Sequence, residues 1–217
     1  NHDDSLTSMV FEKEIRDRLN YHKEIYFCKH HDAHVAISFF LSDFEEAAFM
    51  SIDGVGEIAC TVLGVVQNNK IQVLKEVDFP NSLGMLYNAV TYYLGFNPTQ
   101  DQGKVMGLSA YGDSSKYIDE FRKVVTLKDD GTYQLDFDYF EFYFKRDTWV
   151  SDKFLDTFGP RRLPEEDLNQ RHKDIAAAIQ LRLEELYFHM AEYLKETTNM
   201  KHLCLSGGVA LNSVANG

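Results

Sequence analysis

The sequence predicts an α/β fold, in 217 residues that are enough for one large domain or two small ones. Two observations support this class. Short apolar runs of strand length, such as residues 48–53 and 202–205, are each followed by glycines. Segments with helical periodicity alternate with these runs, most clearly over residues 165–196. Hydrophobic residues make up 44% of the chain, so it can bury a substantial core.

The overall composition narrows the function classes. A formal charge of −12 argues against holding nucleic acid by counterion release, but it leaves room for a locally positive pocket for a phosphorylated small molecule. No apolar run approaches the roughly 20 residues that span a bilayer, so no membrane partner is expected. The three cysteines, Cys28, Cys60 and Cys204, are predicted to be buried free thiols, which indicates a reducing, cytoplasmic compartment.

The first segments of the chain predict a helix, a strand and a second helix. Residues 8–20 combine charges with apolar side chains at roughly helical spacing, which predicts a helix packed on one side. The apolar run 25–28 predicts a buried strand. The next predicted helix, residues 33–41, is so apolar that we expect it to be well covered.

The next segments predict strands around a glycine turn. Strand 48–53 ends at Asp53, and a carboxylate beside a glycine turn at a strand's C-terminal end lies where open α/β sheets bind ligands. Runs 61–66 and 71–77, joined by a short asparagine-containing turn, predict a β-hairpin. This order is typical of actin-like and ribonuclease-H-like ATPase folds, in which an acidic side chain and turn N–H groups meet phosphate and metal.

A predicted helix at residues 85–94 follows, with Ser82 as its N-cap and Gly95 as its C-cap. A helix start with a glycine, here Gly84, attracts anions, although most such turns are only caps. Lys104 is a single cation between glycines. By itself it is compatible with an ordinary surface residue.

Residues 113–164 are aromatic and charged, without clean periodicity, and only residues 132–137 alternate like a strand. We interpret the segment as an insertion that builds a pocket wall or an oligomer contact. A subdomain with its own small core is an equal alternative.

The clearest predicted helix, residues 165–196, carries His172 and His189, which we expect in solvent or at the core edge rather than as ligands. A short strand at 202–205 then leads through Ser206-Gly207-Gly208 into a predicted helix. A strand, two glycines and a helix N-terminus form a backbone cradle for a nucleotide.

A histidine pair gives the strongest chemical signal. His30 and His34 are four residues apart, so on a helix their imidazoles share one face and can grip one divalent ion. Solvated histidines at a polar helix entrance are the alternative, and the nearby Asp53 favours the metal. His31 is a candidate general base or a group that supports the metal ligands, or an idle neighbour.

Five motifs occur in order along the chain: His30-His31-Asp32-Ala33-His34, Asp53-Gly54-Val55-Gly56-Glu57, Ser82-Leu83-Gly84, Lys104-Val105-Met106-Gly107-Leu108 and Ser206-Gly207-Gly208-Val209-Ala210-Leu211-Asn212. Together they resemble the NodU/CmcH family of O-carbamoyltransferases, which includes nodulation-factor, cephalosporin and tobramycin carbamoyltransferases. The resemblance runs from about residue 22 to the C-terminus and is weakest across residues 113–164.

The resemblance implies an actin-like fold, shared with the ATPase subunit of the threonylcarbamoyl-tRNA machinery and with the hydrogenase-maturation carbamoyltransferase. It implies a divalent ion, Fe²⁺ in first place and Mn²⁺ in second, held by His30, His34, Asp53 and an aspartate expected beyond Gly217. It also implies a first strand and phosphate turn before Asn1. A C-terminal domain would make carbamoyl-adenylate from carbamoyl phosphate and ATP with Mg²⁺. Residues 1–217 are thus expected to be part of a longer protein.

The implied activity is metal-assisted transfer of the carbamoyl group from carbamoyl-adenylate to a hydroxyl of a sugar-like or antibiotic acceptor. Lys104 is expected to neutralise charge on the leaving group. The residues expected around the nucleotide are Asp53, Gly54, Ser82, Gly84, Gly207, Gly208 and Asn212. We expect residues 1–217 alone to be inactive, and a homodimer is left open.

Two other functions remain open at this stage. An actin-like small-molecule kinase would hold Mg²⁺ mainly through carboxylates and waters, which would leave the histidine pair without a role. A non-enzymatic, metal-stabilised binding domain would unfold when its zinc is removed. The lack of a nearby cysteine disfavours a closed structural zinc site.

Overall fold

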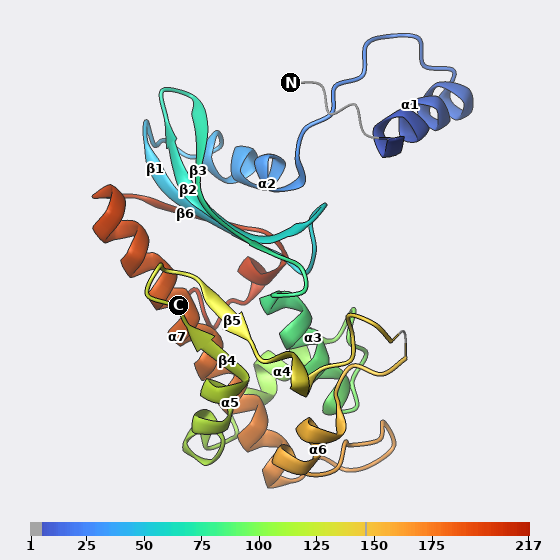
Figure 1. The fold of residues 1–217 in the computed structure, drawn as a ribbon, viewed down its shortest axis with the longest axis vertical. Helices are drawn as coiled ribbons and strands as arrows, with labels where there is room; N and C mark the ends of the chain where they lie inside the picture. Colours follow the sequence, from blue (N-terminus) through green and yellow to red (C-terminus); the bar gives the residue numbers. More distant parts are fainter. Residues whose placement is uncertain (1–5, 146) are drawn as a thin grey trace.

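A computed structural model describes residues 6–145 and 147–217 and shows a mixed α/β architecture (Figure 1). The helices are α1 (Leu6–Leu19), α2 (His30–Phe39), α3 (Leu83–Tyr93), α4 (Gln102–Ser109), α5 (Ile118–Val124), α6 (Asp152–Phe158) and α7 (Gln170–Thr198). The strands are β1 (Ala47–Ile52), β2 (Ala59–Gln67), β3 (Lys70–Asp78), β4 (Val125–Leu127), β5 (Tyr133–Leu135) and β6 (Leu203–Ser206). Short 3₁₀ turns are η1 (Ser114–Lys116), η2 (Phe137–Tyr139) and η3 (Gly208–Leu211). No helix in these ranges is long and apolar enough to cross a membrane.

The main sheet has the order β3-β2-β1-β6. β1 pairs antiparallel with β2 and parallel with β6. Side chains of β1 alternate between two cores: Ala47 and Phe49 pack against α2, whereas Met50 and Ile52 join the larger core with α3 and α7. Because both faces of β1 are covered, its sequence is an almost unbroken apolar run.

The predicted hairpin is confirmed as β2 and β3. Its turn residues, Asn68 and Asn69, both have positive φ, at 51° and 58°. Asparagine tolerates this left-handed backbone, and two such residues give the twist that joins antiparallel strands tightly. β3 is an edge strand with mostly exposed or half-buried side chains.

The long helix is confirmed as α7, although it begins at Gln170 rather than at residue 165. Asn169 caps its start: the Asn169 side chain accepts from the His172 N–H, and the His172 ring accepts from the Asn169 N–H. The apolar side chains that recur at helical spacing along this segment are all buried: Ile175, Ile179, Leu183, Leu186, Met190 and Leu194. The C-terminal part of α7 packs against the sheet, and the rest of the helix runs beyond it, beside α4 and α5 (Figure 1).

The aromatic segment 113–164 shares the main core. Phe121, Phe154 and Phe158 are buried and stack on one another, with ring centroids 4.7 Å apart for Phe121–Phe158 and 4.4 Å for Phe154–Phe158. They belong to the same hydrophobic cluster as β1, α3 and α7, so the segment has no separate core. The strand predicted at 132–137 is present as β5.

The strand predicted at residues 25–28 is wrong, because the segment forms no regular element and pairs with no strand of the described chain. Tyr26 is 78% exposed, and Cys28 is exposed rather than buried. A run of four apolar residues cannot secure burial without a neighbouring strand. Cys60 and Cys204 are buried free thiols, as predicted.

The first two helices are less covered than predicted. α1 is present, but Phe11 and Leu19 are exposed, and the helix lies apart from the sheet and α7 (Figure 1). In α2 the residues spaced four apart, His31, Val35 and Phe39, face the sheet. The other side of α2 and the residues just after it remain exposed, because only one face of the helix meets a partner.

Candidate metal centre and adjoining cavity

Three predicted ligands converge beside the end of β1. The Nε2 atoms of His30 and His34 lie 2.9 Å and 2.8 Å from the same oxygen, Oδ2 of Asp53. The two Nε2 atoms are 3.1 Å apart. All three side chains are partly exposed, so the group is open to solvent and to a ligand. Among the described residues, this is the one group of histidine, cysteine and acidic side chains with the geometry to hold a metal ion.

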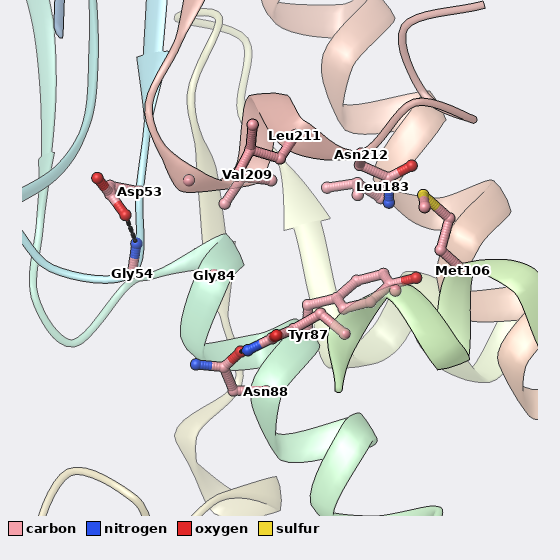
Figure 2. Close-up of a pocket in the computed structure, with 13 residues that line it drawn as sticks. Asp53, Gly54, Gly84, Tyr87, Asn88, Met106, Leu183, Val209, Leu211 and Asn212 are labelled. Atoms are coloured by element: carbon pink, nitrogen blue, oxygen red, sulfur yellow. Dashed lines mark hydrogen bonds between the residues drawn. The ribbon is translucent and has the colours of Figure 1, made fainter. Parts of the chain in front are cut away.

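Local structure fixes both sides of this group. α2 begins at His30, so His30 and His34 lie one turn apart on the same face. Glu57, in the loop after β1, accepts a hydrogen bond of 2.8 Å from the His30 N–H and joins that loop to the helix start. Asp53 is held by the N–H of Gly54, which donates to its Oδ1 at 2.7 Å (Figure 2).

The electrostatics keep Asp53 ionised. Burial alone would raise the pKa of its carboxyl. Hydrogen bonds from His30, from the Gly54 N–H and from His34 outweigh burial and hold the pKa below its ordinary value. A carboxylate beside two imidazole nitrogens is the donor set that a divalent transition metal prefers.

The atomic spacing also fits an ion. Without one, both imidazoles must direct an N–H at the same oxygen, which crowds two donors 3.1 Å apart. Six-coordinate ions with bonds of about 2.1 Å place neighbouring donor atoms about 3.0 Å apart. The observed separations of 2.8–3.1 Å match that spacing. His30, His34 and Asp53 can thus hold one face of such an ion.

His31 lies beneath this group. Its Nδ1 is 2.7 Å from Ser51 Oγ and its Nε2 is 2.9 Å from the Ala59 carbonyl oxygen. Because a carbonyl only accepts, Nε2 carries the proton and Nδ1 accepts from the serine hydroxyl. Burial lowers the pKa of His31, which favours this neutral form. With both nitrogens engaged, His31 anchors α2 to the sheet, and its predicted use as a general base does not fit this geometry.

A cavity of about 410 Å³ is lined by Asp53, the carboxylate of the candidate metal centre (Figure 2). Asp53 lies at one end of it, and the apolar side chains of Met106 and Leu183 lie at the other. Five residues predicted around a nucleotide line it: Asp53, Gly54, Gly84, Gly208 and Asn212. The segment after β6 contributes as the 3₁₀ turn η3 rather than as the predicted α-helix.

Glycines let three chain segments approach one another here. A Cβ on Gly84 would lie 2.7 Å from the backbone of Gly54, and a Cβ on Gly208 would lie 2.9 Å from Asp53 Oδ1. Gly207 has φ of +90°, a conformation that other residues rarely adopt, and it packs against the backbone of Ile52. Side chains at these positions would separate the cavity wall from the metal centre.

Ser82 and Gly207 support the cavity without lining it. The Ser82 hydroxyl caps α3 by accepting from the Met85 N–H at 3.0 Å, and it donates to the carbonyls of Asp53 and Gly54. It is fully buried, so its contribution is to hold the turn after β1 in place.

The amide of Asn212 is largely committed within the protein. It exchanges two hydrogen bonds with Gln180 of α7, at 3.1 Å and 2.9 Å. Gln180 also accepts from the hydroxyl of Tyr87, whose side chain lines the cavity. Sequence reasoning missed both Gln180 and Tyr87, because each looks like an ordinary residue of an amphipathic helix. Only the packing of α3 against α7 brings them to the site.

The structure does not bring Lys104 to this cavity. Lys104 forms an ion pair of 2.9 Å with Asp101 and lines a different cavity. Its neighbours Gly103 and Met106 do face the first cavity, because successive residues of α4 point in different directions. Contrary to the prediction, Lys104 is therefore not positioned to neutralise charge on a leaving group in the first cavity.

Fold and site together define an α/β domain in which a candidate metal-binding group of two imidazoles and one carboxylate adjoins a ligand-sized cavity. The chain belongs to the carbamoyltransferase N-terminus family, whose model matches residues 5–217. This confirms the family that the five motifs indicated.

Three relatives illustrate the similarity. The uncharacterised protein sll1178 of Synechocystis is 46% identical over 88% of this chain and 31% of its own length. Nodulation protein NolNO of Sinorhizobium fredii is 34% identical over 89% of this chain and 27% of its own length. Nodulation protein NolO of Bradyrhizobium diazoefficiens is 34% identical over 87% of this chain and 32% of its own length. The chain thus spans about a third of the length of these curated relatives.

Proposed function

We propose that this chain is the acceptor-transfer part of an O-carbamoyltransferase with an actin-like fold. In this proposal the carbamoyl group comes from carbamoyl-adenylate, which is made from carbamoyl phosphate and ATP, and passes to a hydroxyl of a sugar-like acceptor. The observation that carries the proposal is the double position of Asp53, which faces both histidines and also lines the cavity. Family membership and the sheet order β3-β2-β1-β6 support it.

In this proposal His30, His34 and Asp53 hold a divalent ion, with Fe²⁺ favoured over Mn²⁺. Such an ion, when bound, supplies a Lewis acid for a carbonyl and stabilises negative charge on a hydroxyl oxygen. The two neutral imidazoles favour a transition metal over Mg²⁺, which prefers oxygen ligands. This preference weighs against the kinase alternative.

The cavity matches an adenylate in size and polarity. Pockets for small molecules commonly measure about 300–1,000 Å³, and this one measures about 410 Å³. The glycine backbones near Asp53 let a phosphate approach N–H groups closely. Tyr87 and Leu183 offer apolar surface to a flat base at the other end. The acyl phosphate would then lie on the metal side of the cavity.

The test is metal and nucleotide binding by the full-length protein purified without oxygen. We expect about one iron per chain in the wild type, and at least about a 100-fold loss of metal affinity in His34→Ala, which removes a direct ligand. His22→Ala is the matched control, because His22 is an exposed histidine whose one side-chain hydrogen bond within the described residues is to the side chain of Asn20. A non-hydrolysable carbamoyl-adenylate analogue should bind to the wild type, and carbamoyl transfer to a hydroxyl acceptor should disappear in His34→Ala.

Equal metal content in His34→Ala and His22→Ala would rule out the metal centre. Metal binding without binding of the adenylate analogue would instead rule out the assignment of the cavity. The two halves of the proposal therefore fail separately.

A further inference from the structure

A second cavity, of about 660 Å³, lies between the end of α3, the start of α4 and residues 160–164. Three cationic side chains line it, Lys104, Arg161 and Arg162, against one acidic side chain, Asp101. The lining therefore carries two net positive charges in a protein whose formal charge is −12. Such a local reversal of charge attracts an anion.

Arg162 is a buried charge with no acidic partner among the described residues. It is 8% exposed, and its guanidinium donates to the carbonyls of Leu94, Pro164 and Glu166 at 2.9, 3.1 and 2.8 Å. Gly95, with φ of +77°, makes room for it, since a Cβ there would lie 2.8 Å from Arg162 Nη1. Neutral carbonyls orient the guanidinium without cancelling its charge, so its field reaches the cavity.

Arg161 is held in position with its terminal groups available. Its guanidinium carbon lies 3.8 Å above the ring of Tyr92, and its Nε donates to the Tyr92 carbonyl at 2.9 Å. Neither terminal NH₂ of Arg161 has a hydrogen-bond partner within residues 6–145 and 147–217. A guanidinium fixed in this way can offer its two terminal groups to an oxyanion with little loss of entropy.

His172 is a buried neighbour of Arg171 and Arg162, and the charge of Glu166 acts on it in the opposite direction. His172 is buried behind this region, and burial is the main cause that lowers its pKa. The charges of Arg171 and Arg162 lower the pKa further. Arg171 itself donates to the carbonyls of Phe158 and Pro160 and to the hydroxyl of Tyr93, and it has no carboxylate partner in the described chain.

We propose that this cavity binds the phosphate group of a small molecule, gripped by Arg161 and Lys104 with the field of Arg162 behind them. A phosphate monoester carries a charge of about −1.5 to −2 at pH 7, which matches the two net positive charges. Phe96 and Pro98 give the cavity apolar wall for an organic remainder. Lys104 already pairs with Asp101, so it turns toward the phosphate only when the ligand arrives.

This site is separate from the first cavity. The two share no lining residue, and α4 stands between them: Gln102 and Met106 face the first cavity, whereas Lys104 faces the second. The inference therefore stands independently of the metal centre and of the proposed transfer reaction.

The experiment is calorimetric titration of the full-length protein with inorganic phosphate, ribose 5-phosphate and uncharged ribose, at constant ionic strength. We expect saturable binding of both phosphates and none of ribose. Arg161→Gln should weaken phosphate binding at least about 10-fold, and Lys104→Gln about 3- to 10-fold. Lys123→Gln is the matched control, because Lys123 is also an exposed lysine in an i,i+3 ion pair, with Glu120 on α5.

Lys104 is 59% exposed in its side chain, so Lys104→Gln reports on binding even if Arg161→Gln unfolds. Tighter binding of ribose 5-phosphate than of phosphate would identify an ester as the ligand, and equal affinities would identify free phosphate. The proposal is overturned if ribose binds as well as ribose 5-phosphate, or if Lys104→Gln and Lys123→Gln bind phosphate equally.

Discussion

At the scale of single residues, the three histidines of one motif, His30, His31 and His34, divide between two tasks. His30 and His34 face Asp53, whereas His31 points into the protein and bonds to Ser51 and Ala59. On a helix, residues four apart share one face, whereas the residue that follows the first of them points in another direction. His31 thus fixes the helix that carries the candidate ligands.

Ser51→Ala tests this anchoring. The change leaves the buried Nδ1 of His31 without its donor, so we expect the free energy of unfolding to fall by about 1–3 kcal/mol in urea denaturation. Ser114→Ala, in the half-exposed turn η1, should change it by less than about 0.5 kcal/mol. If the two variants were equally stable, the hydrogen bond from Ser51 to His31 would not contribute to stability.

At the scale of elements, the ends of helices position the site. α2 begins at His30, and α3 begins at Leu83 beside the turn after β1. Both starts meet the C-terminal end of β1, so the candidate metal centre and the cavity share one corner of the sheet. Close packing at that corner depends on the glycines there.

Gly84→Ala should be costly for that reason. Its new Cβ would lie 2.7 Å from the Gly54 backbone, so we expect a loss of about 1–3 kcal/mol in the free energy of unfolding. Gly107→Ala is the control: Gly107 is also in a helix but meets nothing within 4 Å. There alanine should stabilise the protein by about 0.5–1 kcal/mol. Similar urea midpoints for the two variants would contradict the close approach.

The start of α7 should make stability depend on pH. The pKa of His172 is lowered in the folded protein, first by burial and then by Arg171 and Arg162. His172 therefore binds a proton more readily in the unfolded chain than in the folded one. Its contribution to the free energy of unfolding is complete above the unfolded pKa of about 6.5 and is lost as pH falls below it. In His172→Gln, glutamine can keep the capping box without titrating.

We expect the urea midpoint to fall less between pH 7.5 and pH 5.5 in His172→Gln than in the wild type. The pH dependence of stability that remains in the variant includes the contribution of His31, because burial also lowers the pKa of His31. Parallel pH profiles of the two proteins would show that His172 does not titrate in this range.

At the scale of the whole molecule, the fold places the two cavities described above on opposite sides of α4. One contains Asp53 of the candidate metal group, and the lining of the other includes three cations and one acidic side chain. Residues 113–164, predicted to build a pocket wall, do not line the first cavity, but Arg161, Arg162 and Pro164 line the second. Whether this segment also makes an oligomer contact stays a prediction.

We expect the 217-residue chain alone to transfer no carbamoyl group. The relatives are about three times as long, and the resemblance assigns the making of carbamoyl-adenylate to a further domain. The measurement is carbamoylation of a hydroxyl acceptor with carbamoyl phosphate and ATP, with full-length protein as the positive control. Detectable transfer by residues 1–217 would refute this expectation.

The sequence by itself determined the features that depend on short-range spacing. The histidines four apart, the Asn68-Asn69 turn, the stripe of α7 and the glycine positions each follow from backbone geometry over a few residues. The histidine spacing and the strand-end Asp53 predicted the candidate metal ligands, and the glycine turns predicted part of the cavity wall. The family was indicated by the resemblance of five ordered motifs, not by spacing.

Tertiary structure alone decided which side chains meet across long separations. Lys104 lines a second cavity together with Arg161, and the hydroxyl of Tyr87 donates a hydrogen bond to Gln180. The apolar run 25–28 stays largely exposed. Such outcomes depend on which helix faces are covered and on which strands find partners. Those are properties of the packed chain, because burial and charge are set by neighbours that local spacing does not specify.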